Sequence, residues 1–214
     1  MIAFPKDKTV VRPVEDFLLG ERLARMQGRE IGATDLFRLL NAAKLKGVLI
    51  GAHAVNTRSG DPRATQDVDI VAEKPKKVVE LFRRAFPHLS VEDHPVVVRF
   101  KDGGRVAIDV IKPSSSALFK RILKLTESLK VQEVAITLAD PEALLALKFQ
   151  AMASGARATE KKYQDASDFI TLAKQLKRVN ETKLNELGEL VYAGAGKELL
   201  KLIADARAGR RLEF

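Results

Sequence analysis

The sequence contains no cysteine, and only three of its 214 residues are histidines. Without cysteine, a disulfide framework and thiolate metal sites are both excluded, and the chain fits a reducing compartment. The three histidines, His53, His88 and His94, show no repeating spacing of metal ligands. We therefore expect no zinc site.

Long hydrophobic runs are also missing. No uninterrupted apolar run approaches the roughly 20 residues that cross a bilayer, and the first six residues have no apolar core of the kind found in signal peptides. We therefore expect a soluble, cytoplasmic protein with no membrane partner.

The chain carries an excess of positive charge, with a formal net charge of +9 and a pI near 9.7. Such an excess attracts polyanions such as nucleic acid or nucleotide phosphates. The alternative is that the charge serves only solubility. The composition, 46% hydrophobic and 30% charged, is that of an ordinary globular protein.

Hydrophobic periodicity predicts an α/β (α+β) protein, because strands and helices mix in the first two thirds and helices alone fill the last third. We interpret residues 1–138 as a catalytic domain with N-terminal helices and a mixed sheet, and 139–214 as a C-terminal helical subdomain. The predicted strands are 47–50, 67–72, a hairpin of 96–100 and 105–111, and 134–137. The predicted helices are 13–27, 34–46 with Thr34 as N-cap, one from about 51, 75–86, 117–126, 142–153, 160–177, 181–193 and 196–207.

Two aspartates on the second strand indicate a metal site. Asp67 and Asp69 are two residues apart, so their side chains point to the same side of a strand. Two close carboxylates repel each other, and a divalent cation relieves the repulsion. Ligands that are all oxygen select Mg²⁺ or Mn²⁺. The alternative for this pair is a solvated strand end.

Asp109 is the only charged residue of the apolar run from Val106 to Ile111, so we expect this carboxylate to have a partner. If its strand pairs beside the strand of Asp67 and Asp69, the three carboxylates converge. They would then hold two cations about 3.5–4 Å apart, as in phosphoryl-type transfer. The alternative is a salt bridge with Arg99 or Arg105.

A nucleotide triphosphate would find a second set of residues nearby. Gly51 and Ala52 stand where a buried strand turns into a helix, and helix N-termini with close glycine backbone bind anions. Packing alone also explains a glycine there. Arg63 and Thr65 add a cation and a hydroxyl before the acidic strand. No P-loop is expected, because the segment 195–198 lacks the upstream glycine and the Ser/Thr of that motif.

The sequence resembles the DNA polymerase β-like nucleotidyltransferase superfamily. The resemblance covers roughly residues 45 to 175 and is strongest to the AbiEii-type abortive-infection toxins, a group of type IV toxins. The segments that carry it are Leu49-Ile50-Gly51-Ala52-His53-Ala54-Val55-Asn56, Pro62-Arg63-Ala64-Thr65-Gln66-Asp67-Val68-Asp69-Ile70, Pro141-Glu142-Ala143-Leu144-Leu145-Ala146-Leu147-Lys148 and Lys161-Lys162-Tyr163-Gln164-Asp165-Ala166-Ser167-Asp168.

The resemblance implies a nucleotidyltransferase fold and a role for each matching residue. Gly51 would touch the triphosphate, and the three aspartates would bind Mg²⁺, with Asp109 helping to activate the attacking hydroxyl. Lys148 would reach the nucleotide phosphates, and Asp165 or Asp168 would orient Lys148 or the base. Ala52 departs from the pattern, because such proteins have Gly or Ser at this position.

Each candidate residue of the helical part can also be explained without a functional role. Lys148 lies beside an apolar stripe, where lysines extend along the surface toward water. Asp165 and Asp168 share one helix face through their spacing of three, whether or not that face lines a cleft. Arg157, with Lys161 and Lys162, either grips a polyanionic acceptor or belongs to a solvated loop, and we favoured the loop.

Two functions remain open. The first is a metal-dependent, toxin-like nucleotidyltransferase that moves NMP from an NTP such as ATP to a hydroxyl of RNA, including tRNA, or of a protein. The second is a weak or inactive relative that binds nucleic acid or a cognate antitoxin. Ala52 favours the second function, and the three retained aspartates favour the first. The sequence leaves the acceptor, the base preference and the oligomeric state undetermined.

Overall fold

The structure is a computed structural model that describes residues 12–213. Within this range the chain forms seven strands, nine α-helices and a short 3₁₀ helix, η1 (Pro113–Ser115). The strands are β1 (Gly47–Leu49), β2 (Val68–Ala72), β3 (Ser90–Asp93), β4 (Val97–Asp102), β5 (Arg105–Ile111), β6 (Thr126–Val131) and β7 (Val134–Ala139). The helices are α1 (Pro13–Met26), α2 (Ala33–Ala42), α3 (Gly51–Ser59), α4 (Pro75–Ala85), α5 (Ala117–Ile122), α6 (Pro141–Ala153), α7 (Thr159–Gln175), α8 (Glu181–Glu189) and α9 (Ala195–Arg207).

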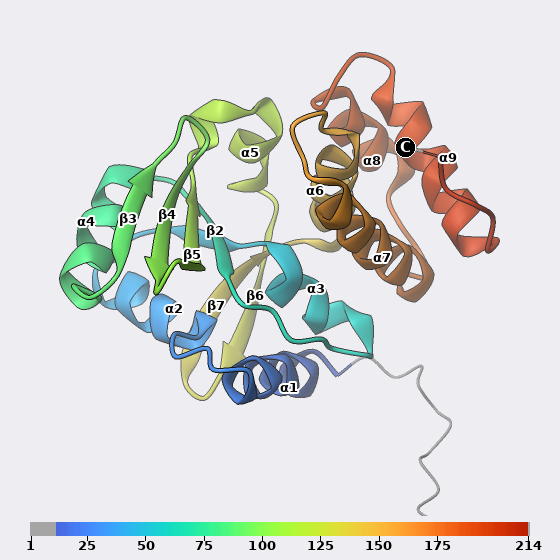
Figure 1. Cartoon of the computed structure of the whole chain (residues 1–214). Coiled ribbons are helices and arrows are strands. Elements are labelled where there is room, and N and C mark those ends of the chain that lie inside the picture. Colours follow the sequence, from blue (N-terminus) through green and yellow to red (C-terminus); the bar gives the residue numbers. More distant parts are fainter. Residues whose placement is uncertain (1–11, 214) are drawn as a thin grey trace, which may run out of the picture.

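The seven strands form one mixed sheet in the order β3-β4-β5-β2-β1-β7-β6 (Figure 1). The pairs β2–β5 and β1–β7 are parallel, and the other neighbours are antiparallel. This arrangement confirms the predicted α+β class with a mixed sheet.

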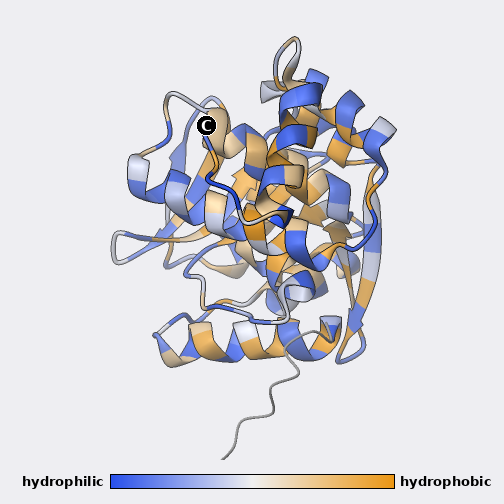
Figure 2. Ribbon diagram, turned by 90° about the vertical axis from the view of Figure 1, so that its right-hand side faces the viewer, coloured by the Kyte–Doolittle hydropathy of each residue, from blue (hydrophilic) through white to orange (hydrophobic). Residues whose placement is uncertain are grey.

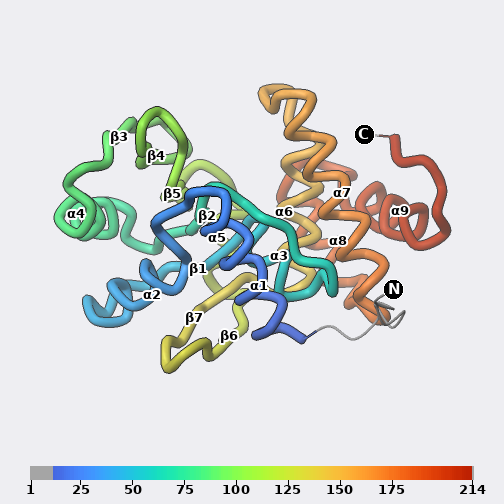
Figure 3. The backbone as a smooth tube through the Cα atoms, turned by 60° about the horizontal axis from the view of Figure 1, so that its bottom comes forward, coloured from blue at the N-terminus to red at the C-terminus, as the bar shows by residue number. Residues whose placement is uncertain are grey.

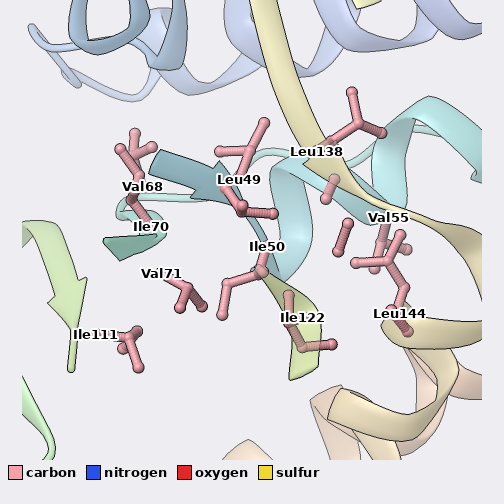
Figure 4. Packing of buried hydrophobic residues seen from close by; sticks show 14 of the residues in the cluster. Leu49, Ile50, Val55, Val68, Ile70, Val71, Ile111, Ile122, Leu138 and Leu144 are labelled. Atoms are coloured by element: carbon pink, nitrogen blue, oxygen red, sulfur yellow. The ribbon is translucent and has the colours of Figure 1, made fainter. Parts of the chain in front are cut away.

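The two faces of β2 have different environments, as its alternating sequence requires. Val68 and Ile70 are fully buried, and a Cβ atom at Gly47 would touch both Ile70 and Leu40 of α2. Figure 4 shows this part of the core around Leu49, the strand partner of Ile70. Since Ile70 faces α2, the side chain of Asp69 points to the opposite face of the sheet.

The C-terminal helices α6 to α9 pack against one another beside the sheet (Figures 1 and 3). The first of them begins at a strong start signal: Asp140 accepts a hydrogen bond from the Ala143 N–H at 2.9 Å, and Pro141 occupies the first turn. Helix α3 contacts both α6 and α7. The boundary expected between residues 138 and 139 falls just before the last residue of β7.

Three predicted helices end four residues earlier than expected, and one predicted N-cap is wrong. Helix α8 ends at Glu189 instead of residue 193. Helix α2 ends at Ala42 instead of residue 46, because Lys44 has a left-handed backbone with φ of 53°. Its N-cap is Gly32 instead of Thr34, which lies inside the helix, and Asp35 accepts the Gly32 N–H at 3.0 Å. Helix α5 ends at Ile122 instead of residue 126, since β6 begins at Thr126.

Hydrophobic residues concentrate in the centre of the molecule, between the sheet and the helices, as Figure 2 shows. Among residues 12–213, every helix is too short or too polar to span a membrane.

Candidate active site

Three carboxylates meet where β2 and β5 run side by side. Asp69 and Asp109 are direct partners in the parallel register of these strands, and Asp67 comes immediately before β2. One oxygen from each of the three lies within 4.8 Å of the others. The convergence expected from the sequence is therefore present, although Asp67 precedes the strand instead of beginning it.

The charges of this cluster are unfavourable without a cation. Burial raises the pKa of Asp69 well above its usual value, and the charges of Asp67 and Asp109 raise it further. Burial also raises the pKa of Asp109 to about 6, against the opposing effect of Arg99. Three close oxygen ligands with these properties fit a hard divalent cation such as Mg²⁺ or Mn²⁺.

Asp109 also forms an ion pair with an arginine, which the sequence analysis gave as the alternative to a metal site. The Nε atom of Arg99, on the neighbouring strand β4, lies 3.5 Å from Asp109 Oδ1. The ion pair involves Arg99 and not Arg105, whose strand partner is Asp102. The single positive charge of Arg99 does not balance three carboxylates. Asp109 therefore belongs both to this ion pair and to the acidic cluster.

Gly51 lies against this cluster at the start of α3. Its φ is +68°, a conformation that glycine adopts without strain, and an added Cβ atom would lie 2.0 Å from Asp69 Oδ2. The chain therefore requires glycine here to leave room for the carboxylate. The next residue, Ala52, is buried with 7% exposure.

A cleft of about 480 Å³ opens in front of the carboxylates. On the sheet side its lining includes Gly51, Asp69 and Asp109, and on the helical side it includes Lys148 and Arg157. Apolar side chains complete part of the wall; they are Val96, Ile111, Phe119 and Leu147. The cleft thus combines an acidic floor, a cationic wall and an apolar patch.

Lys148 is buried and held by two carboxylates of α7. Its Nζ atom lies 2.9 Å from Asp165 Oδ1 and 2.7 Å from Asp168 Oδ2. Burial would lower the pKa of Lys148, but the two aspartates outweigh it and raise this pKa. Both aspartates that the sequence placed near Lys148 thus contact it, and Lys148 does not extend along a solvated surface.

Arg63 and Thr65 lie close to the site, but they are not among the described residues that line the cleft. Arg63 donates to both oxygens of Asp168, at 3.0 and 2.9 Å. Despite burial, the pKa of Asp168 is lowered, because Lys148 and Arg63 face it. The Thr65 hydroxyl donates to Asp67 Oδ1 at 3.0 Å. Arg63 and Thr65 therefore bind aspartates of the site, Asp168 and Asp67, instead of lining the cleft.

Arg157 lies in an exposed loop, as expected, and it also lines the cleft. Its Nε and Nη2 atoms are both 2.8 Å from Asp165 Oδ2, and 41% of its side chain is exposed. Lys161 and Lys162 do not line the cleft. Sequence spacing could not distinguish the three, because the loop before α7 sets which of them turns inward.

The apolar patch of the cleft was also absent from the sequence-based site. Val96 precedes β4, Ile111 ends β5, Phe119 belongs to α5 and Leu147 to α6, so four separate segments supply it. A single-sequence pattern carries no signal for such a convergence.

Comparison with known proteins supports the fold. An antigenic nucleotidyltransferase-like protein from Paracoccidioides brasiliensis superposes with a TM-score of 0.56 at 21% identity, over 83% of this chain and 87% of that one. JHP933 from Helicobacter pylori gives a TM-score of 0.47 at 16% identity, over 91% and 93%. The lincomycin-bound lincosamide antibiotic adenylyltransferase LnuA gives 0.44 at 18% identity, over 64% and 92%. No family model and no curated protein matches the sequence. The first of these superpositions, with its TM-score above 0.5, shows that the chain has a nucleotidyltransferase-like fold.

Proposed function

We propose that this protein is a metal-dependent nucleotidyltransferase that moves NMP from an NTP to a hydroxyl acceptor. The observation that carries the proposal is the convergence of Asp67, Asp69 and Asp109 beside a cleft with cationic and apolar walls. The shared fold supports it. Structural ion pairs alone do not explain a cluster in which burial and neighbouring carboxylates raise the pKa values of Asp69 and Asp109 beside a cleft.

The NTP would lie in the cleft. Its phosphates would face Gly51, Lys148 and Arg157, and its base would contact the apolar patch of Val96 and Phe119. Asp165 and Asp168 would orient Lys148, and Asp165 would also fix Arg157, since guanidinium and ammonium groups hold phosphates well when their geometry is set in advance.

The acidic cluster would hold Mg²⁺ or Mn²⁺, which supplies charge neutralisation and polarises the phosphoryl oxygens. In the reaction, the acceptor oxygen forms a bond to the α-phosphorus while the bond between the α-phosphorus and the bridging oxygen breaks. Pyrophosphate leaves with the electron pair, and Asp109 takes the hydroxyl proton as general base.

Label transfer tests this proposal. The protein would be incubated with each NTP radiolabelled at the α-phosphate, total cellular RNA and Mg²⁺. We expect a labelled RNA product that disappears with EDTA and with Asp67→Ala, but persists with Asp61→Ala at an exposed position outside the cluster. Undiminished transfer by Asp67→Ala would remove Asp67 from the site.

RNA, including tRNA, is the acceptor that the net charge of +9 favours. The AbiEii-like motifs further suggest a toxin whose activity a cognate antitoxin restrains. Expression in a bacterial host would then slow growth, and Asp67→Ala would relieve the effect. Equal growth inhibition by both proteins would argue against a toxin that acts through this site.

Ala52 supports a second candidate, a binding module with weak or no transfer activity. It replaces the Gly or Ser of the resembled pattern, so no hydroxyl is available there for the terminal phosphates. Calorimetry with Mg²⁺ and ATP separates the two candidates: Mg²⁺-dependent binding supports the enzyme, and no binding at millimolar ATP supports the module.

A further inference from the structure

A second cavity, of about 350 Å³, lies beside Gln66, two residues before β2 begins. It is enclosed by residues 24–31, which join α1 to α2, by the β4–β5 turn and by Gln66. The two cavities share no lining residue.

The residues that line the second cavity are close in the chain to those of the acidic cluster. Gln66 immediately precedes Asp67, and Ala107 comes two residues before Asp109 on β5. At about 3.3 Å per residue, Ala107 is roughly 7 Å along the strand from Asp109. The cleft includes Asp69 and Asp109. The second cavity therefore reaches the residues just before Asp67 and Asp109 in the chain, whereas the cleft includes Asp69 and Asp109 themselves.

A β-bulge shapes the wall of the second cavity. Phe100 pairs with Ile108 while its neighbour Lys101 pairs with Val106, so Ala107 is an extra residue in β5. Bulges bend a strand and redirect its side chains, and they occur often beside functional sites. Here the bulge exposes both Val106 and Ala107 to the cavity.

The opposite wall is fixed by hydrogen bonds that lead to the acidic cluster. Arg29 donates to Glu21 Oε1 at 2.6 Å and to the Thr65 carbonyl at 3.3 Å. Thr65 in turn donates to Asp67 Oδ1 at 3.0 Å. The cavity wall and Asp67 therefore belong to one hydrogen-bonded unit, so a group bound in this cavity has a defined position relative to Asp67.

The chemistry of the cavity differs from that of the cleft. Four charged side chains line it, Arg29, Glu30, Asp102 and Arg105, and of these Arg29 is paired with Glu21. The other side chains that line it are the amides of Gln27 and Gln66 and the apolar Ala24, Ile31, Val106 and Ala107. Its volume is near the lower end of the range for ligand pockets, about 300–1,000 Å³. Such a cavity, with amide, guanidinium and carboxylate groups beside apolar side chains, suits a flat group that both donates and accepts hydrogen bonds.

We propose that this second cavity binds the terminal nucleoside of a single-stranded RNA acceptor. Amide and guanidinium groups such as Gln27, Gln66 and Arg105 match the edges of unpaired bases. The acceptor hydroxyl then faces the acidic cluster from the side opposite the NTP, as attack on the α-phosphorus and departure of pyrophosphate require. The proposal rests on the proposed function and adds the place and class of its second substrate.

Photocrosslinking tests the location without relying on activity. A single-stranded RNA oligonucleotide with 4-thiouridine as its 3′-terminal nucleotide would be irradiated with the full-length protein, and the labelled peptides mapped. We expect crosslinks within residues 24–31 or 102–107. Crosslinks confined to the cleft residues or to the C-terminal helices would overturn the proposal, as would a failure of the RNA to bind.

Kinetics separate this proposal from the proposed function. For the double variant Gln66→Ala with Arg105→Ala, we expect the KM for the oligonucleotide to rise about tenfold or more, with Mg²⁺-dependent ATP binding unchanged. A single Arg84→Ala change at an exposed site on α4, outside both cavities, removes the same charge and should leave both values unchanged. An unaltered KM in the double variant would refute the acceptor cavity, whereas absent ATP binding by the wild type would refute the proposed function instead.

Discussion

Gly51 and Asp69 are in such close contact that the backbone of one limits the position of the other: a methyl group on Gly51 would lie 2.0 Å from Asp69 Oδ2. The carboxylate cannot move away freely, because Asp69 is fixed in register opposite Asp109. The glycine at this strand–helix junction is therefore required by the acidic cluster, whatever it also does for a phosphate.

The first prediction concerns Gly51→Ala. We expect it to destabilise the protein and to abolish Mg²⁺-dependent ATP binding, because the methyl group displaces Asp69. Gly209→Ala is the matched control, since Gly209 has nearly the same φ, +69° against +68°, but has no atom within 4 Å of the added Cβ. Thermal unfolding and calorimetry of both variants would separate the clash from the shared backbone strain. Equal losses in both would contradict this explanation.

The second prediction concerns Asp69→Asn. In EDTA we expect this variant to be more stable than the wild type, because burial and the charges of Asp67 and Asp109 disfavour the ionised Asp69. Each kcal/mol gained would raise Tm by about 2–4 °C in a protein of this size. Mg²⁺ should then raise the Tm of the wild type but not of the variant. Asp61→Asn, at an exposed site, serves as control, and a lower Tm for Asp69→Asn in EDTA would contradict the repulsion.

The third prediction contrasts two cations that bind Asp165. Lys148→Met leaves two buried carboxylates without their shared partner, so we expect a loss of about 3 kcal/mol in the free energy of unfolding. Arg157→Ala should cost less than about 1 kcal/mol, because its side chain is 41% exposed and screened by water. Both should weaken ATP binding.

Urea unfolding and calorimetry would check these values. If Lys148→Met were as stable as the wild type, the buried network would not contribute to stability in the way its distances indicate. Unchanged ATP binding by Arg157→Ala would remove this residue from the phosphate site.

The fourth prediction concerns His53, which is buried beneath α1. Arg29 donates to its Nε2 atom, so the ring proton is on Nδ1, 3.3 Å from Glu21 Oε1. Burial, with the positive charges of Arg29 and Arg63, lowers the pKa of His53 well below 6.5. The unfolded chain therefore binds a proton near pH 6.5 that the folded protein does not bind, and stability falls as pH decreases below that value.

From about pH 7.5 to about pH 5.5, His53 should contribute a loss of about 1.4 kcal/mol. His53→Gln keeps an acceptor for Arg29 but does not titrate, so its stability should fall less over the same range. Urea unfolding at both pH values measures the difference. The raised pKa values of Asp69 and Asp109 act in the opposite direction in both proteins and cancel in the comparison. Parallel curves would contradict the prediction.

The strands that the sequence did not predict are the two edges of the sheet. β3 is a short run, Ser90-Val91-Glu92-Asp93, without buried residues, and in β6 only Val131 is buried. An edge strand has a single strand neighbour and is largely solvated here, so neither sequence carries the apolar alternation that reveals a strand. The inner strands β1, β2, β4, β5 and β7 were all predicted, because burial on the sheet forces that pattern on them.

The local parts of the site could be predicted from the sequence. Backbone sterics place residues i and i+2 on one side of an extended segment, so Asp67 and Asp69 had to point the same way, and Asp109 stood out as a charge among buried residues. Three features became visible in the folded chain: β5 lies parallel to β2 with Asp109 opposite Asp69, Arg157 lines the cleft, and a second cavity forms beside Gln66. These contacts join segments far apart in the chain, and their geometry follows from how the whole core packs, which no local spacing records.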